Sequence, residues 1–167
     1  MNDDKKSAPD ADMTLSSEVI SQCVEKVRKD TETIGLYISE IVTGDSFWSQ
    51  VRRFERSFYD ATVIDCVRFI KAADFRAVKG FDTTMTGPED WDFDKKIRLR
   101  GKVDLISKPI YHNEAEFNLK KYLTKKSYYA KSFAPYINKW GKNDPDIKKQ
   151  FGFYYRYLGV FIEKGKW

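Results

Sequence analysis

The chain has 167 residues, of which 41% are hydrophobic and 33% are charged, and its formal net charge is +5. This composition is typical of a folded domain with a core and excludes an intrinsically disordered protein. No apolar run approaches the roughly 20 residues of a membrane-spanning helix, and the start "MNDDKKSAPD" lacks the apolar stretch of a secretory signal. Cys23 and Cys66 have no metal-type spacing, so we expect reduced thiols in a cytosolic protein.

The elements expected from hydrophobic periodicity alternate between helices and strands up to about residue 111, which favours an α/β fold. The first is a helix after the N-cap candidates at residues 16–18, followed by a strand at "TIGLYISEIV" and a helix in "SFWSQVRRFERSFYDATV". Next come a strand and a short helix in "CVRFIKAADFRAVKGFD". A helix in "DKKIRLRG" that ends at Gly101 and a strand at "KVDLIS" complete this part. Two further amphipathic helices are expected from Leu119 and from Ile147, and Pro135 would kink or end the first.

Charge is unevenly distributed along the chain. Residues 1–118 are acidic, whereas residues 119–167 hold twelve lysines and arginines against three acids. The stretches "LKKYLTKKSYYAKSF" and "QFGFYYRYLGVFIEKGK" interleave these lysines with aromatic residues. They fit a surface for nucleic acid, anionic lipid or a partner helix, and equally an aromatic stripe that faces the core with lysines in solvent.

The first candidate for chemistry is "DADM", with Asp10 and Asp12 just before the first expected helix. On an extended segment the two carboxylates would point the same way, and paired carboxylates suit Mg²⁺ or Mn²⁺ with substrate phosphates. On spacing alone, an acidic cap at a helix N-terminus is the stronger alternative.

The second candidate is His112 in "PIYHNE", the single histidine of the chain. It follows an expected strand and a proline, so it should lie at a strand end. Neutral imidazole is a common metal ligand, although a lone histidine is more often structural.

The third candidate is "GPEDWDF", which crowds Glu89, Asp90 and Asp92 around Trp91 behind a Gly-Pro turn. A general base needs a carboxylate near the proton that it removes, and Trp91 offers a flat apolar face for a sugar ring. The alternative is an acid-rich helix start after Pro88, and the residues by themselves leave both interpretations open.

Taken in this order, the motifs resemble the inverting glycosyltransferases of family 2, which have a GT-A fold. "DADM" resembles their D-x-D motif, "VRFIKAADFRAVKGFD" the segment that leads to the acceptor site, "GPEDWDF" the element with the base, and "PIYHNE" the strand-end histidine. The resemblance covers about residues 10–116, and the basic stretch that begins at Leu119 continues it. It implies a partial GT-A (Rossmann-like) fold with a C-terminal pair of amphipathic helices.

The resemblance also implies roles for single residues. Asp12 and His112 would bind a divalent cation, Mn²⁺ or Mg²⁺, and Asp10 would help to hold the diphosphate of a nucleotide-sugar donor. Asp90 would deprotonate the acceptor hydroxyl. The substrate-binding residues would be Asp10, Arg68, Glu89 and Trp91. Glu89 would order the loop and Trp91 would line a sugar. Arg68 would be either structural or in contact with an acceptor.

The same resemblance divides the chain into a stub at residues 1–9, an acceptor-side and metal-binding half at 10–116, and a basic helical tail at 117–167. The family places a nucleotide-binding half before D-x-D, so we expect this chain to be a fragment without donor affinity of its own. The expected partners are a nucleotide-sugar, a sugar or lipid-linked acceptor and an anionic membrane surface, with no nucleic acid. The expected location is cytoplasmic, peripheral at the inner face of the membrane. The alternative functions are a non-catalytic interaction domain, or a module that binds nucleic acid or an anionic surface through the tail.

Overall fold

The computed structural model describes residues 13–115 and 118–163. The predicted stub at residues 1–9 and the predicted domain boundary at residues 116 and 117 lie outside this part. The strands are β1 (Met13–Leu15), β2 (Thr33–Thr43), β3 (Phe69–Ile70) and β4 (Lys102–Asn113). The helices are α1 (Val19–Lys29), α2 (Phe47–Arg56), α3 (Ala72–Ala77), α4 (Glu89–Arg100), α5 (Leu119–Ala130), α6 (Phe133–Trp140), α7 (Pro145–Phe151), the π-helix η1 (Tyr155–Gly159) and α8 (Val160–Glu163).

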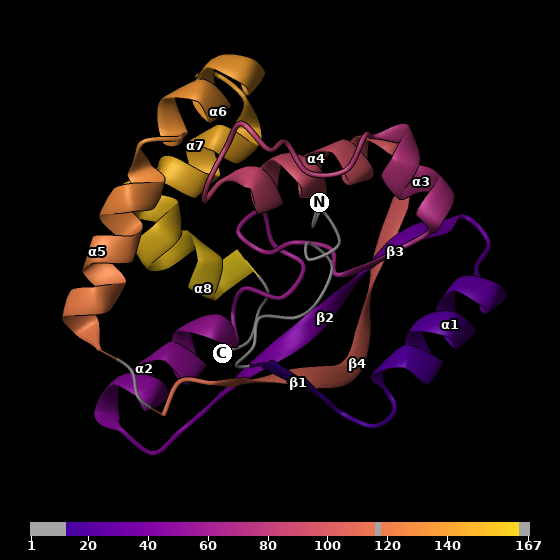
Figure 1. The fold of residues 1–167 in the computed structure, drawn as a ribbon, viewed down its shortest axis with the longest axis horizontal. Coiled ribbons are helices and arrows are strands. Elements are labelled where there is room, and N and C mark those ends of the chain that lie inside the picture. The colour runs from indigo at the N-terminus through magenta and orange to yellow at the C-terminus, as the bar shows by residue number, and fades with distance from the viewer. Residues whose placement is uncertain (1–12, 116–117, 164–167) are drawn as a thin grey trace, which may run out of the picture.

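The four strands form one mixed sheet in the order β1-β4-β2-β3 (Figure 1). The two long strands β2 and β4 are parallel, while β1 and β3 pair with them in antiparallel fashion. The mixed α/β class expected from the sequence is therefore confirmed. Parallel pairing has a consequence for function, because the carboxyl ends of β2 and β4 meet at one edge of the sheet.

Strand β4 is longer than the sequence predicted, since it continues beyond "KVDLIS" to Asn113. The continuation passes through Pro109, which has no backbone N–H to give to a neighbouring strand. The register between β2 and β4 shifts between Ile38 and Glu40, so Pro109 falls in an irregularity of the ladder. A proline is tolerated at such a bulge, and the strand carries on to His112.

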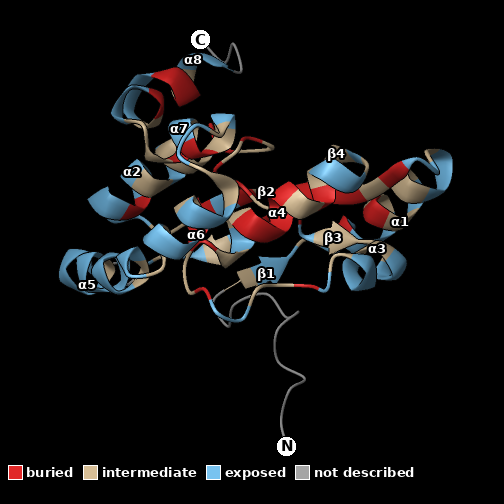
Figure 2. Ribbon diagram, turned by 90° about the horizontal axis from the view of Figure 1, so that it is seen from above, coloured by how far each residue is buried: buried red, intermediate tan, exposed pale blue. Residues whose placement is uncertain are grey.

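Helices cover both faces of the β2–β4 pair. On one face Val19 and Cys23 of α1 are fully buried against Leu36 and Ile106. On the other face Phe93 and Ile97 of α4 are fully buried in a cluster with Tyr37 and Val67. Figure 2 shows the buried residues gathered on the central strands and on the helix surfaces that face them. This layered core fixes the ends of β2 and β4 relative to the start of α4.

The C-terminal segment differs from the predicted pair of helices. The first predicted helix breaks between Ala130 and Phe133, and Pro135 lies in the first turn of α6, where its missing N–H costs no helical hydrogen bond. The second breaks at Gly152, where the backbone becomes extended, and a side chain there would meet the Lys148 carbonyl oxygen at 2.3 Å, so the position requires glycine.

Helix α5 has no buried residue. The large exposed hydrophobic residues include Phe47 on α2, Leu123 on α5 and Tyr157 on η1. None of the helices in the described part is long and apolar enough to cross a membrane. Association of this tail with an anionic membrane surface stays a prediction.

Candidate functional site

A buried carboxylate and the single histidine meet at the carboxyl edge of the parallel pair. Glu40 lies on β2 with only 7% of its surface exposed, and His112 lies on β4, where it is the register partner of Val42. The His112 Nδ1 is 2.8 Å from a Glu40 carboxylate oxygen. An ionised carboxylate can only accept, so Nδ1 carries the proton and a neutral His112 has its lone pair on Nε2.

Two arginines hold the Glu40 carboxylate. Arg68 donates to it at 2.6 Å from the segment just before β3, and Arg56 donates to it from the end of α2. Burial alone would raise the pKa of Glu40, but the His112 hydrogen bond and the two guanidinium groups outweigh burial and lower the pKa to about 2. Glu40 is therefore ionised at neutral pH and holds the histidine in one orientation.

A second carboxylate, Glu114, lies just beyond β4. Its side chain pairs with Arg52 of α2 at 3.2 Å and lies 3.7 Å from His112 Nδ1. The buried Ser49 hydroxyl donates to the Glu114 backbone carbonyl at 2.8 Å, which ties this turn to the start of α2. Both carboxylates beside His112 are thus engaged by arginines, so neither is well suited to bind a cation.

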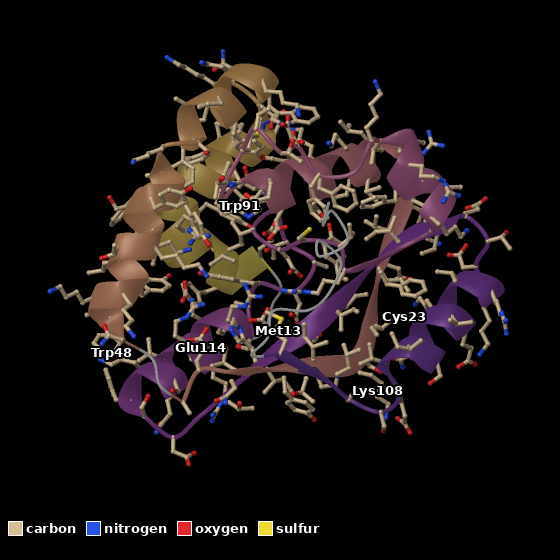
Figure 3. The ribbon with its side chains drawn as sticks, in the orientation of Figure 1. Met13, Cys23, Trp48, Trp91, Lys108 and Glu114 are labelled. Atoms are coloured by element: carbon tan, nitrogen blue, oxygen red, sulfur yellow. The ribbon has the colours of Figure 1, made fainter. Side chains whose placement is uncertain are left out.

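The predicted metal ligands Asp10 and Asp12 lie outside the described residues. Met13, which follows Asp12 in the chain, is the first residue of β1 and pairs with His112. Figure 3 shows Met13 and Glu114 toward the same end of β4. Across residues 13–115 and 118–163, no group of three or more His, Cys, Asp or Glu side chains forms a metal site. A cation at this edge would therefore need a carboxylate from outside that part in addition to His112.

The acids of "GPEDWDF" occupy the first turn of α4, with Pro88 as N-cap. Of the two interpretations that the sequence left open, the structure confirms the acid-rich helix start, and the catalytic role of these acids stays a prediction. Asp92 is fully buried and accepts from Trp140 Nε1 at 2.9 Å, so its role is structural. Glu89 accepts from the Gly87 N–H, which orders the turn as expected. Asp90 is exposed at the surface, as a base that meets a substrate must be.

Trp91 is only partly buried, yet its ring packs within the protein. It lies 6.4 Å from Phe133 and 5.9 Å from Phe151, measured between ring centroids, and its Nε1 donates to the Ile64 carbonyl at 3.3 Å. It joins α4 to the C-terminal helices (Figure 3). These contacts give Trp91 a structural role, and its contact with a sugar stays a prediction.

The segment 65–68 connects the start of α4 with the Glu40–His112 pair. Burial raises the pKa of the Cys66 thiol, and the neighbouring carboxylates, of which Asp90 contributes most, raise it further. Two residues later, Arg68 contacts Glu40. The structure thus brings Arg68 and His112 together through Glu40, while Glu89, Asp90 and Trp91 come from the start of α4.

Glu40, Arg52, Arg56 and Glu114 were not among the site residues predicted from the sequence. A signal for Glu40 was available, because a charged residue within the apolar strand "TIGLYISEIV" is seldom buried without a partner. Its partners could not be identified in the same way, since they lie 16, 28 and 72 positions further along the chain.

Asp65 provides a test of the electrostatics beside the site. Burial raises its pKa from 3.8 to about 6, although Arg68, Arg56 and the Ala61 N–H favour the ionised form. The folded state binds this proton more tightly than the unfolded chain, so stability falls as pH rises from about 4 to about 6. The loss amounts to ~3 kcal/mol. Asn keeps an acceptor for the Ala61 N–H and does not titrate.

We therefore expect the stability of Asp65→Asn relative to the wild type to increase by ~3 kcal/mol from pH 4 to pH 8. The measurement is the free energy of unfolding in urea at both pH values. Equal differences between the two proteins at pH 4 and pH 8 would contradict this expectation.

Comparisons with known proteins return no match to any family model, curated protein or solved structure. A functional assignment therefore depends on the residues and their geometry.

Proposed function

We propose that the chain is part of a metal-dependent, inverting glycosyltransferase of family 2 with a GT-A fold. The observation that supports this most is the pairing of β1 with β4. Asp12 and His112 are the two expected metal ligands, 100 positions apart in sequence, and the residue next to Asp12 pairs with His112. The pairing of β1 with β4 brings together the segments next to the two expected ligands, as a shared cation site requires, while the Asp12 carboxylate itself lies outside the described residues.

The residues around the site suit this assignment. Glu40 accepts from His112 Nδ1, which leaves Nε2 as the nitrogen able to bind a cation. A carboxylate that orients a ligating histidine in this way is a usual companion of metal sites. Asp12 and His112 would hold the cation, with Asp10 close to the donor diphosphate. When bound, the cation would neutralise charge on the leaving diphosphate.

Asp90 would carry out the proton transfer. Its carboxylate takes the proton of the acceptor hydroxyl as the hydroxyl oxygen forms a bond to the anomeric carbon. The bond from that carbon to the donor diphosphate breaks on the opposite side, and its electron pair leaves with the diphosphate. The configuration at the anomeric carbon is therefore inverted. Glu89 supports this by fixing the turn before α4.

The proposal is tested by incubating the complete gene product with Mn²⁺, a panel of nucleotide-sugars and candidate acceptors, and by assigning the product anomer by NMR. We expect transfer with inversion, and we expect EDTA to abolish it because the cation neutralises the leaving group. A product with retained configuration, or full activity in EDTA, would contradict the proposal.

A further inference from the structure

A tyrosine ring on α5 lies between two cations. The Arg52 guanidinium carbon is 5.4 Å from the centre of the Tyr122 ring, and Lys126 Nζ is 5.3 Å from it. Tyr122 and Lys126 are four positions apart on α5 and therefore share one face of the helix. This face is turned toward α2, which contributes Arg52.

A second tyrosine ring repeats the arrangement between α2 and the C-terminal helices. The Arg56 guanidinium carbon is 5.7 Å from the centre of the Tyr59 ring, and that of Arg156 is 5.5 Å from it. Arg156 belongs to η1, and π-helical turns are frequent at functional sites. The tyrosine–cation cluster consists of Arg52, Arg56, Tyr59, Tyr122, Lys126 and Arg156.

Positive charge in the cluster is incompletely neutralised. Of the cluster's arginines, Arg52 pairs with both Glu55 and Glu114, and Arg56 pairs with Glu40. Neither Lys126 nor Arg156 forms an ion pair with any acid of residues 13–115 and 118–163. Lys126 is exposed on α5, yet desolvation of its ammonium group lowers its pKa; repulsion from the three arginines of the cluster lowers it further, and Glu55 opposes the shift. Glu55 also interacts with Arg156, so Lys126 and Arg156 lack an ion pair but feel one nearby carboxylate.

The cluster also holds an unused donor. The Nε of Arg56 is buried and has no hydrogen-bond partner in the described part of the chain. A buried N–H without an acceptor is costly, and a water or an anion bound at that place is one explanation for it. An anion in the cluster would have several N–H groups within reach of its oxygens.

We propose that the tyrosine–cation cluster binds a phosphate group with two negative charges, such as a phosphomonoester or a diphosphate. Lys126 and Arg156 have no ion-pair partner among the described residues and could pair with the two charges of a dianion, and the guanidinium group of Arg156 suits the geometry of phosphate oxygens. The cluster adjoins the Glu40–His112 pair, because Arg56 contacts Glu40 and Arg52 contacts Glu114. A phosphate bound here would lie beside the proposed transferase site, but its binding depends neither on a cation nor on transfer.

The test is calorimetric titration with inorganic pyrophosphate in EDTA. We expect the wild type to bind, and we expect the double variant Lys126→Gln, Arg156→Gln to bind about 10²- to 10⁴-fold more weakly, as the loss of two charged hydrogen bonds implies. Lys126→Arg, which keeps the charge, should bind as the wild type does. The matched control is Lys120→Gln, Lys121→Gln, which removes the same charge from exposed positions of α5 and should leave affinity unchanged. Thermal unfolding of each variant verifies the fold.

Failure of the wild type to bind, or equal weakening in the control pair, would overturn the proposal. Vesicles of phosphatidylcholine with phosphatidic acid or with phosphatidylglycerol then identify the source of the phosphate. If the wild type prefers vesicles with phosphatidic acid and the double variant Lys126→Gln, Arg156→Gln does not, the ligand is a lipid-borne phosphomonoester. Pyrophosphate binding without that preference supports a phosphate ester free in solution. Because EDTA is present throughout, failure here is distinct from failure of the metal-dependent transferase.

Discussion

Asp90→Asn is expected to lower the rate of sugar transfer by about 10²- to 10⁴-fold in the complete gene product, with little change in stability. Asn cannot accept the proton of the acceptor hydroxyl at neutral pH. Asp90 is exposed at the start of α4, so replacing it leaves the core unaltered, and it also lies close enough to Cys66 to affect the thiol. The measurement is the initial rate at saturating donor and acceptor, together with the melting temperature.

Glu89→Gln is the matched control from the same helical turn. Its side-chain oxygen can still accept from the Gly87 N–H, so we expect a much smaller loss of transfer. Normal turnover by Asp90→Asn would eliminate Asp90 as the base. Equal losses in the two variants would mean that the helix start is structurally sensitive and that Asp90 has no special role.

Glu40→Gln is expected to have the largest effect among changes that touch no substrate. It removes the negative charge shared by Arg56, Arg68 and His112 and leaves two partly buried arginines without that partner. Breaking a buried ion pair on one side typically costs 3–5 kcal/mol, so we expect ~3 kcal/mol or more in urea unfolding. If His112 binds a cation, losing the carboxylate that orients it should also weaken Mn²⁺ binding by about 10- to 100-fold.

Glu55→Gln is the control for this effect. Glu55 pairs with Arg52 and accepts from Tyr59, and it is therefore a similar carboxylate that does not contact His112. We expect its Mn²⁺ affinity to equal that of the wild type. The ¹⁵N chemical shifts of the His112 ring should show the Nδ1-protonated tautomer in the wild type and change in Glu40→Gln. Unchanged shifts and unchanged affinity would show that Glu40 is purely structural.

The sequence predicted the local elements well in segments where a single hydrophobic period, that of a helix or of a strand, dominated. The strand at "TIGLYISEIV", the first helix, and the helix that ends at Gly101 all follow from patterns within a dozen residues. The extension of β4 through Pro109 was not predictable from such a pattern, because the bulge that accepts the proline depends on the partner strand. The breaks after Ala130 and at Gly152 were likewise not predicted from the helical pattern of the tail.

The candidate site was predictable only in its separate parts. His112, Arg68 and the acids of α4 stand out by residue type, and a glycosyltransferase pattern orders them along the chain. Their connection through Glu40 is a tertiary fact, since β2 lies between β4 and β3 in the sheet. The tyrosine–cation cluster is similar, because its members come from α2, the turn after α2, α5 and η1, and each sequence segment shows only ordinary basic residues and tyrosines.

The most direct test of the transferase assignment is calorimetric titration of Mn²⁺ into the chain, with and without UDP. We compare the wild type with the double variant Asp12→Ala, His112→Ala and with Glu32→Ala, which removes an exposed carboxylate just before β2, at the opposite end of that strand. We predict that one Mn²⁺ binds to the wild type and to Glu32→Ala, that binding is lost in the double variant, and that UDP strengthens it where donor-binding residues are present. Wild-type affinity in Asp12→Ala, His112→Ala, or no Mn²⁺ binding by the complete gene product, would contradict the proposed metal-dependent transferase.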